Sequence, residues 1–354
     1  MKLWKSLPFV LAITLLAACS QPSAQTPETN TTTAESTVSD SGTADANVPA
    51  EGTEVSDSEL YTDSVEMADM VSIEDEAVAL ADAPPPAVVG ILKPVASGSK
   101  VQSNAQATID YSNTGDGYVM VKSGSSSGKR LKVQVAAATT YTYDIQPGNW
   151  TTFPLSDGNG TYKVTVFENV SGSKYATVVS ASFPVTLKDE FEPFLRPNQY
   201  VDYENAPNTV AKAQEIAGGT ADPLQKVAKI YDYVVNNLTY DKAKATSVQS
   251  GYLPVLDSVL ASKKGICFDY ASLMTGMLRS QGVPCKLVIG YAGTAYHAWV
   301  SVWTKETGWI DGVIFFNGTT WQRMDPTFIS SSKGSQNVQQ FVGNGSNYTQ
   351  KFLY

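Results

Sequence analysis

The 354-residue sequence predicts a multidomain protein in which a disordered N-terminal tether precedes an antiparallel β-sandwich and then an α+β domain. Three observations predict this order. Residues 20–86 hold fifteen Asp and Glu but no Lys or Arg. From about 88 to 187 apolar and polar residues alternate, which is the period of a half-buried strand. After Lys188 helical spacing comes first and alternating strands follow.

The composition excludes several classes of protein. The chain has 25 Lys and Arg, 34 Asp and Glu and a net charge of −9, but residues 87–354 hold 23 bases and 19 acids. That body is close to neutral and has no dense basic stripe, so no nucleic-acid partner is expected. Three Cys and one His exclude a disulfide scaffold and a zinc site of four cysteines or several histidines. No metal or organic cofactor is implied.

Residues 1–19 are predicted to be a lipoprotein signal peptide. Two lysines precede the apolar run 7–18, which is too short to span a bilayer because a helix needs roughly twenty residues. The run ends in Leu16-Ala-Ala-Cys19, which resembles a bacterial lipobox. We therefore expect a lipid on Cys19 to anchor the protein to the extracytoplasmic side of the bacterial cell membrane. The alternative is an ordinary signal-peptidase site beside a bystander cysteine.

Residues 20–86 are predicted to be a disordered acidic linker. They are rich in Ser, Thr, Ala, Asp and Glu, and Tyr61 is their one aromatic residue. Such a segment cannot bury enough apolar surface to offset its chain entropy. We expect it to act as a solvated spacer that lifts the rest of the protein off the membrane.

Residues 87–187 are predicted to form the β-sandwich. Turn signals rich in Gly, Asn and Asp separate stretches in which apolar and polar residues alternate. These stretches are Ala107–Tyr111, Leu131–Val135, Tyr141–Ile145 and Tyr162–Val166. Short alternating strands at this spacing indicate an antiparallel sandwich. The module resembles the immunoglobulin-like (Ig-like) modules of bacterial surface proteins, although it has no cysteine for an inter-sheet disulfide.

Residues 188–354 open with helices. Asp222-Pro223 predicts a helix start with Pro at its first position, and apolar residues then recur at helical spacing to about Leu238. Shorter helices are expected over roughly 206–217 and 254–262. A buried helix is expected over 268–281, because Gly265 permits a tight turn before it and Gly282 ends it.

Cys267 lies at the first turn of that last helix. The helix dipole and the unbonded N–H groups there favour an anion, so the position favours a thiolate. A backbone N–H at this end is also placed to hold a developing oxyanion. Cys267 is therefore the candidate nucleophile.

Two hairpins follow, over 287–303 and 310–324, and the second turns through Asn317-Gly318. His297 opens the second strand of the first hairpin, and Asp325 closes the last strand. If this antiparallel sheet packs on the Cys267 helix, the three side chains can converge. Cys267 would then be the nucleophile, His297 the base and later the acid, and Asp325 the group that orients the imidazole.

Four motifs in this order resemble the transglutaminase-like core of bacterial proteins, over roughly residues 190–327. The Cys-to-His and His-to-Asp spacings are 30 and 28 residues. The motifs are Lys264-Gly-Ile-Cys267-Phe-Asp-Tyr-Ala271, Gly282-Val-Pro-Cys-Lys-Leu-Val-Ile-Gly-Tyr291, His297-Ala-Trp299 and Trp321-Gln-Arg-Met-Asp325-Pro-Thr327. The resemblance implies a papain-like α+β fold, a Cys-His-Asp triad and a catalytic domain over 188–354.

The resulting hypothesis is a membrane-anchored extracellular thiol enzyme that acts on peptide or protein amides, with cell-wall or surface peptides as plausible substrates. The sequence does not choose between hydrolysis and acyl transfer to an amine, and it leaves the oligomeric state open. One alternative is a catalytically inactive adhesion or binding lipoprotein with the same fold. Another is a structural lipoprotein in which Cys267 is merely buried.

Three neighbouring residues receive structural interpretations. Asp269 is expected to be a partner of the helix dipole on another side of the helix from Cys267. Trp299 shares the strand face of His297, where it shields the site or packs in the core. Cys285 is expected to be reduced and buried, because the helix of about 21 Å between it and Cys267 exceeds the reach of a disulfide.

Overall fold

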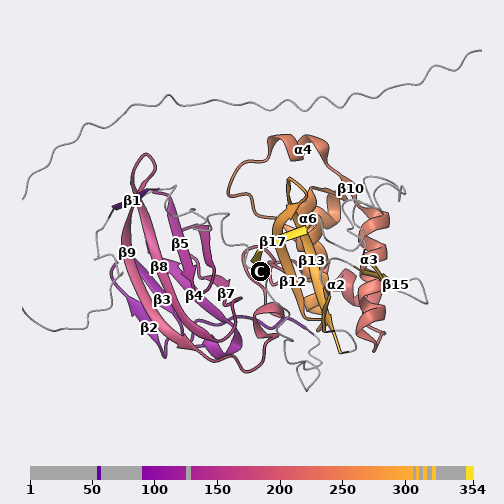
Figure 1. Cartoon of the computed structure of the whole chain (residues 1–354), viewed down its shortest axis with the longest axis horizontal. Helices are drawn as coiled ribbons and strands as arrows, with labels where there is room; N and C mark the ends of the chain where they lie inside the picture. The colour runs from indigo at the N-terminus through magenta and orange to yellow at the C-terminus, as the bar shows by residue number, and fades with distance from the viewer. Residues whose placement is uncertain are drawn as a thin grey trace, which may run out of the picture. The chain divides into compact units, whose positions relative to one another are not determined.

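The computed structural model describes residues 54–56, 90–124, 129–305, 308–310, 314–316, 321–323 and 348–354 (Figure 1). The predicted signal peptide with Cys19, most of the predicted linker, and Asp325 lie outside these ranges. Residues Pro49–Tyr354 belong to one compact unit. Among the described helices, none combines the length and the apolar character needed to span a bilayer.

The first part of this unit contains two antiparallel sheets. The strands of the larger sheet are β1 (Glu54–Ser56), β5 (Leu131–Ala136), β6 (Thr140–Ile145), β8 (Gly160–Ser171) and β9 (Lys174–Val185). Their order is β1-β9-β8-β5-β6, so β6 is an edge strand. The strands of the smaller sheet are β2 (Val101–Ser103), β3 (Ala107–Asp110), β4 (Tyr118–Ser123) and β7 (Thr151–Pro154), in the order β2-β3-β4-β7.

Apolar residues from both sheets share one hydrophobic core. Among them are Ile109, Val121 and Phe153 from the smaller sheet, and Val133 and Val164 from the larger one. Ile109, Val133 and Val164 come from the predicted alternating stretches, in which alternate side chains of a strand point to the same face. The predicted antiparallel strands are therefore present, and the Ig-like character of the module stays a prediction. Strand β1, which pairs with β9, falls inside the predicted disordered linker.

The second part is built around one buried helix. Its helices are α2 (Pro207–Ala217), α3 (Pro223–Asn237), α4 (Lys242–Ser247), α5 (Leu256–Ser262) and α6 (Cys267–Ser280). Helices α2, α3 and α5 pack against α6, and 12 of the 14 residues of α6 are buried. Gly276 allows this close packing, because a Cβ there would lie 2.7 Å from Leu256 Cδ1. The predicted start of α3 is confirmed, with Asp222 accepting a hydrogen bond from the Leu224 N–H.

A four-stranded antiparallel sheet covers another side of α6. Its strands are β12 (Cys285–Ala292), β13 (Ala295–Thr304), β14 (Gly308–Ile310) and β17 (Tyr348–Leu353), in the order β14-β13-β12-β17. The first predicted hairpin is confirmed as β12–β13. The second predicted hairpin is present where the structure describes it and includes β15 (Ile314–Phe316), whereas Ile310 belongs to β14, which pairs with β13. Strand β15 pairs with β16 (Trp321–Arg323).

This arrangement confirms the predicted α+β fold with antiparallel sheets.

A short parallel pair, β10 (Thr239–Tyr240) and β11 (Lys264–Gly265), precedes α6 and brings residue 240 beside the start of that helix. The edge strand β6 packs against the second part of the unit. The Tyr141 ring lies 5.6 Å from that of Phe352, and the Tyr143 ring lies 5.9 Å from that of Tyr354.

Candidate active site

Cys267 is the first residue of α6, as the sequence predicts to within one residue. Ile266 precedes it in an extended conformation, and the Tyr270 N–H bonds to the Ile266 carbonyl to begin the helical turn. The Cys267 side chain is partly exposed and lines a pocket. The N–H groups of a helix start face this end, where they favour an anion.

The second described cysteine has the opposite environment. Cys285 is fully buried at the start of β12, and neither it nor Cys267 forms a disulfide. Burial raises the pKa of the Cys285 thiol to about 12. The prediction of a reduced, buried Cys285 is confirmed, and the two thiols differ sharply in their access to solvent.

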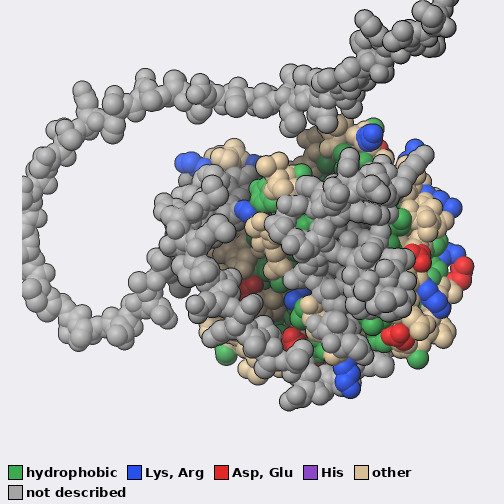
Figure 2. Space-filling view, turned by 45° about the vertical axis from the view of Figure 1, so that its right-hand side comes forward, with side chains coloured by type: hydrophobic (Ala, Val, Ile, Leu, Met, Phe, Trp, Pro, Cys, Tyr) green, Lys and Arg blue, Asp and Glu red, His purple; other side chains and the backbone are tan. Residues whose placement is uncertain are grey.

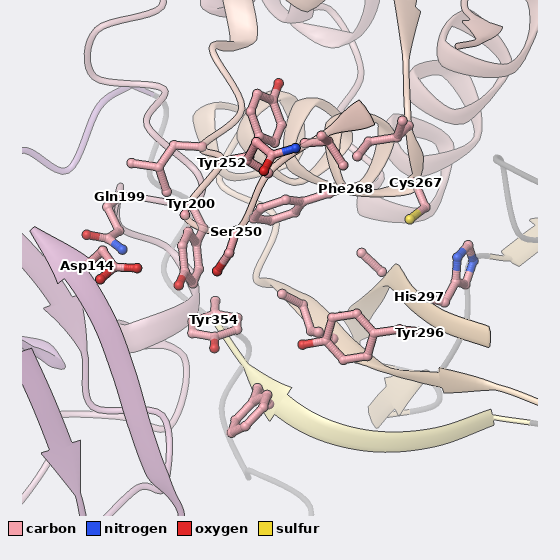
Figure 3. A pocket seen from close by; sticks show the side chains of 18 of the residues that line it. Asp144, Gln199, Tyr200, Ser250, Tyr252, Cys267, Phe268, Tyr296, His297 and Tyr354 are labelled. Carbon is pink, nitrogen blue, oxygen red and sulfur yellow. The ribbon is translucent and has the colours of Figure 1, made fainter. Parts of the chain in front are cut away.

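His297 lies on β13, opposite Gly290 of β12, and is 6% exposed. Its ring lies nearly parallel to that of Trp299, at 6.3 Å between centroids and 23° between planes. Figure 3 shows the thiol of Cys267 and the imidazole of His297 turned toward the same space, from α6 and β13 respectively. The structure thus brings together two members of the predicted triad.

The third member, Asp325, lies outside the described residues, so its role in orienting His297 stays a prediction. Residue Tyr348 was missed by sequence reasoning. Its ring lies 6.3 Å from His297 and 5.2 Å from Trp299, so it helps to enclose the imidazole. Tyr348 belongs to β17, a strand that no local sequence pattern predicted.

Gly290 makes this enclosure possible. A Cβ atom at this position would lie 2.1 Å from the carbonyl oxygen of Thr349 and 2.9 Å from the Trp299 ring. Strand β17 can therefore approach β12 beside His297 only if residue 290 has no side chain. The sequence signal was present, since an isolated glycine inside a strand pattern often marks a close approach of another backbone.

Asp269 has a wider structural role than the predicted interaction with the helix dipole, because it also binds side chains of the segment that contains α4. Its carboxylate is completely buried and accepts hydrogen bonds from Lys244 Nζ at 2.6 Å, from Tyr252 Oη at 2.5 Å and from the Ile266 N–H at 2.8 Å. The first two donors lie in the segment that contains α4. Asp269 therefore ties the start of α6, two residues from the thiol, to a segment that lines the pocket.

The pocket in front of Cys267 has a volume of about 530 Å³. Much of its wall is aromatic, and the aromatic lining residues are Tyr200, Tyr240, Tyr252, Phe268, Tyr296, Phe352 and Tyr354. Burial, and to a smaller extent the charge of the Cys267 thiolate, raise the pKa of Tyr240. Tyr240 and Cys267 line the same pocket. The site is thus a partly enclosed, largely aromatic cavity with a thiol and an imidazole in its wall.

The charged side chains of the described residues form no concentrated patch on the face shown in Figure 2. On the face shown in Figure 2, the Lys and Arg side chains of the described residues are scattered singly among side chains of other types. Within the ranges that the structure describes, no group of three or more His, Cys, Asp or Glu side chains is placed to hold a metal ion. The pocket beside Cys267 is therefore the feature of the described chain that best supports chemistry.

Residues 210–326 match the model of the transglutaminase-like superfamily. This part of the chain is a transglutaminase-like domain. The matched range spans Cys267, His297 and Asp325, together with helices α3 to α6 and the β12–β13 hairpin.

Individual relatives are distant. The chain is 26% identical over 187 residues to a protein-glutamine gamma-glutamyltransferase of Pseudomonas aeruginosa, over 48% of this chain and 26% of that protein. It is 28% identical over 171 residues to an uncharacterized protein of Mycobacterium tuberculosis strain H37Rv, over 44% of this chain and 50% of that protein. The matches thus span about a quarter and one half of the lengths of these relatives.

A similarity also extends to solved structures. The structure of a candidate cysteine protease from Cytophaga hutchinsonii aligns with a TM-score of 0.34 and 14% sequence identity. The alignment covers 67% of this chain and 83% of that chain.

Proposed function

We propose that this protein is a thiol enzyme that acts on amide bonds of peptides or proteins, with Cys267 as nucleophile, His297 as base and acid, and Asp325 as the group that orients the imidazole. One observation carries the proposal. The transglutaminase-like domain holds a partly exposed thiol at a helix start and an imidazole at the same end of one 530 Å³ pocket. A nucleophile and a base within one pocket are the minimum set for acyl chemistry.

The first half of the reaction forms a thioester. His297 takes the proton of the Cys267 thiol, and the sulfur attacks the amide carbonyl carbon. The oxygen becomes negatively charged and is stabilised by N–H groups at the start of α6. The C–N bond then breaks, and the imidazolium gives its proton to the departing amine, which leaves an acyl group on sulfur.

The second half restores the thiol. Water or a primary amine gives a proton to His297 and attacks the thioester carbonyl, and the C–S bond breaks with the proton returning to sulfur. Water gives hydrolysis, whereas an amine gives acyl transfer. Of the relatives above, the Pseudomonas protein is named for glutamyl transfer and the Cytophaga protein for peptide cleavage. Both outcomes therefore belong to the proposal.

The proposal places this chemistry outside the cytoplasm. A lipid on Cys19 would hold the chain at the membrane, and the acidic segment over 20–86 would separate the domain from the bilayer. Peptides of the cell wall or of surface proteins would then be within reach.

The decisive experiment compares the full chain with its Cys267→Ala variant on a peptide library, with and without an added primary amine. The expected result is product with the unaltered chain and a loss of at least about 1000-fold with the variant. The matched control is Cys285→Ala, which removes a thiol outside the pocket and should retain activity. Equal product from the unaltered chain and from Cys267→Ala would overturn the proposal.

A further inference from the structure

One wall of the pocket comes from outside the transglutaminase-like domain. Strand β6 alternates, with Tyr141 and Tyr143 in the hydrophobic core and the intervening side chains on the outer face of the sheet. Those outer residues, Thr140, Thr142 and Asp144, line the same pocket as Cys267 and His297. Since β6 is an edge strand, no other described strand of its sheet lies between it and the pocket. The two-sheet module is therefore part of the site.

Asp144 is distinctive among the residues that line this pocket. Among the lining residues that the structure describes, it is the only Asp, Glu, Lys or Arg. Its partner Lys132, opposite on β5, lies outside the lining, is 4% exposed and binds Asp144 Oδ1 at 2.8 Å. The second carboxylate oxygen, Oδ2, lies beside Gly251 of the pocket wall, where a Cβ would be 3.5 Å away. Lys132 thus binds one carboxylate oxygen of Asp144 from within the sheet, and the other oxygen lies beside the pocket wall.

Aromatic rings extend from the thiol toward this carboxylate. Phe268 follows Cys267 in α6, and its ring lies edge-on to that of Tyr200 at 5.4 Å. Figure 3 shows both rings between Cys267 and His297 at one end of the pocket and Asp144 at the other. Aromatic faces attract cations, and a carboxylate attracts them more strongly. The carboxylate of Asp144 would repel an anionic group placed beside it.

Building on the proposed function, we propose that the far end of the pocket binds a protonated primary amine of the acyl-donor substrate. The side chain that carries it would lie along Phe268 and Tyr200 and end at Asp144, with the hydroxyls of Thr140 and Thr142 beside it. The substrate class is a peptide amide with a lysine-like residue near the reacting carbonyl. The β-sandwich then selects substrates, in addition to any role as a spacer.

The test uses the full chain and peptide amides of one scaffold, with Lys, norleucine or Glu at each position near the reacting amide. At one position we expect kcat/KM for Lys to exceed that for norleucine about tenfold and Glu to be poorest. Asp144→Asn should bring the Lys-to-norleucine ratio close to one, and Asp144→Glu should restore most of it. Asp202→Asn makes the same charge change outside the pocket lining and should leave the ratio unaltered.

A second measurement separates this inference from the proposed reaction. Binding of the fluorescein-labelled Lys and norleucine peptides to Cys267→Ala needs no turnover, and the Lys peptide should bind about tenfold more tightly. Loss of that difference in Cys267→Ala/Asp144→Asn supports the amine site even if no peptide is turned over. The inference is overturned if Asp144→Asn leaves the Lys-to-norleucine ratio unaltered in both binding and turnover. That result would not affect the proposed reaction.

Discussion

The carboxylate of Asp269 accepts a hydrogen bond of 2.6 Å from the ammonium group of Lys244, with no part of the Asp269 side chain exposed to solvent. This pair joins the helix that carries the candidate nucleophile to the segment that forms part of the pocket wall. The hydrogen bond from Tyr252 to the same carboxylate adds a second tie. Burial and this hydrogen bond to Asp269 raise the pKa of Tyr252, so the phenol remains a donor at neutral pH.

Asp269→Asn should lower the free energy of unfolding by about 2 kcal/mol. The neutral amide is a weaker acceptor for the Lys244 ammonium, the Tyr252 hydroxyl and the Ile266 N–H than the buried carboxylate is. Urea unfolding measures this change. A double-mutant cycle with Lys244→Met isolates the pair, whose coupling should be about 1 kcal/mol since Lys244 is only 27% exposed. Strictly additive effects of the two substitutions would show that the pair does not couple these segments.

Alkylation should distinguish the two described cysteines. In the folded protein, iodoacetamide should modify Cys267 and spare Cys285, because the thiolate is the reactive form and burial raises the pKa of Cys285 to about 12. Selectivity should therefore persist from pH 6 to pH 9, and denaturant should abolish it. Peptide mapping by mass spectrometry gives the site of modification. Modification of Cys285 at a comparable rate in the folded protein would contradict the burial described above.

The reactivity of Cys267 should also depend on its imidazole neighbour. His297→Ala should slow alkylation near pH 6.5 by about tenfold if the imidazolium stabilises the thiolate. The control is Tyr233→Phe, which removes a hydroxyl outside the pocket lining and should leave the rate unaltered. Stopped alkylation assays over pH 5–9 report the difference. Superimposable pH–rate profiles for the unaltered chain and His297→Ala would show that His297 does not affect the reactivity of the Cys267 thiol.

Gly290→Ala should destabilise the protein by about 2–3 kcal/mol, because the new Cβ would lie 2.1 Å from the Thr349 carbonyl oxygen. Relief of the clash requires β17 to move away from β12, which also moves Tyr348 away from His297. The matched control is Gly219→Ala, where a Cβ would have no atom within 4 Å and the change should be under about 0.5 kcal/mol. Similar unfolding midpoints for the two variants would contradict the close approach of these strands.

Arg279→Met should cost about 3 kcal/mol of stability. Arg279 is 1% exposed and donates to the carbonyl oxygens of Cys285, Arg196 and Tyr354, so the substitution leaves three acceptors without this donor. Burial lowers the pKa of Arg279 to about 10, which still leaves it protonated at neutral pH. Arg279→Lys should rescue little of the loss, because an ammonium group lacks the planar fork. Full stability in the Lys variant would show that charge alone suffices.

Local signals predicted the elements that carry the site. Asp222-Pro223 marked the start of α3, and Gly265 with Gly282 bracketed α6, because caps and turns act through residues a few positions apart. The alternation of residues around His297 predicted the β12–β13 hairpin for the same reason. The structure accordingly places Cys267 and His297 on one pocket.

Long-range contacts account for what the sequence did not reveal. Strand β17 has no clean alternation, and its pairing of Leu353 with Val288 joins residues far apart in the chain. Helix α4, which follows the N-cap Asp241, has only six residues and therefore shows no sustained helical pattern. The place of Asp144 in the pocket follows from the packing of β6 on the second part of the unit, which no local pattern encodes.

The aromatic contact between β6 and the end of the described chain also bears on how the protein can be divided. Tyr143 and Tyr200 approach the ring of Tyr354 to 5.9 and 4.6 Å, and the Tyr354 side chain is 4% exposed. A chain cut at Lys188 would bring this ring surface into water and open one side of the pocket. Exchange of the two-sheet module for an unrelated one would therefore expose this apolar surface and remove part of the pocket wall at the same time, so the two parts form one structural unit.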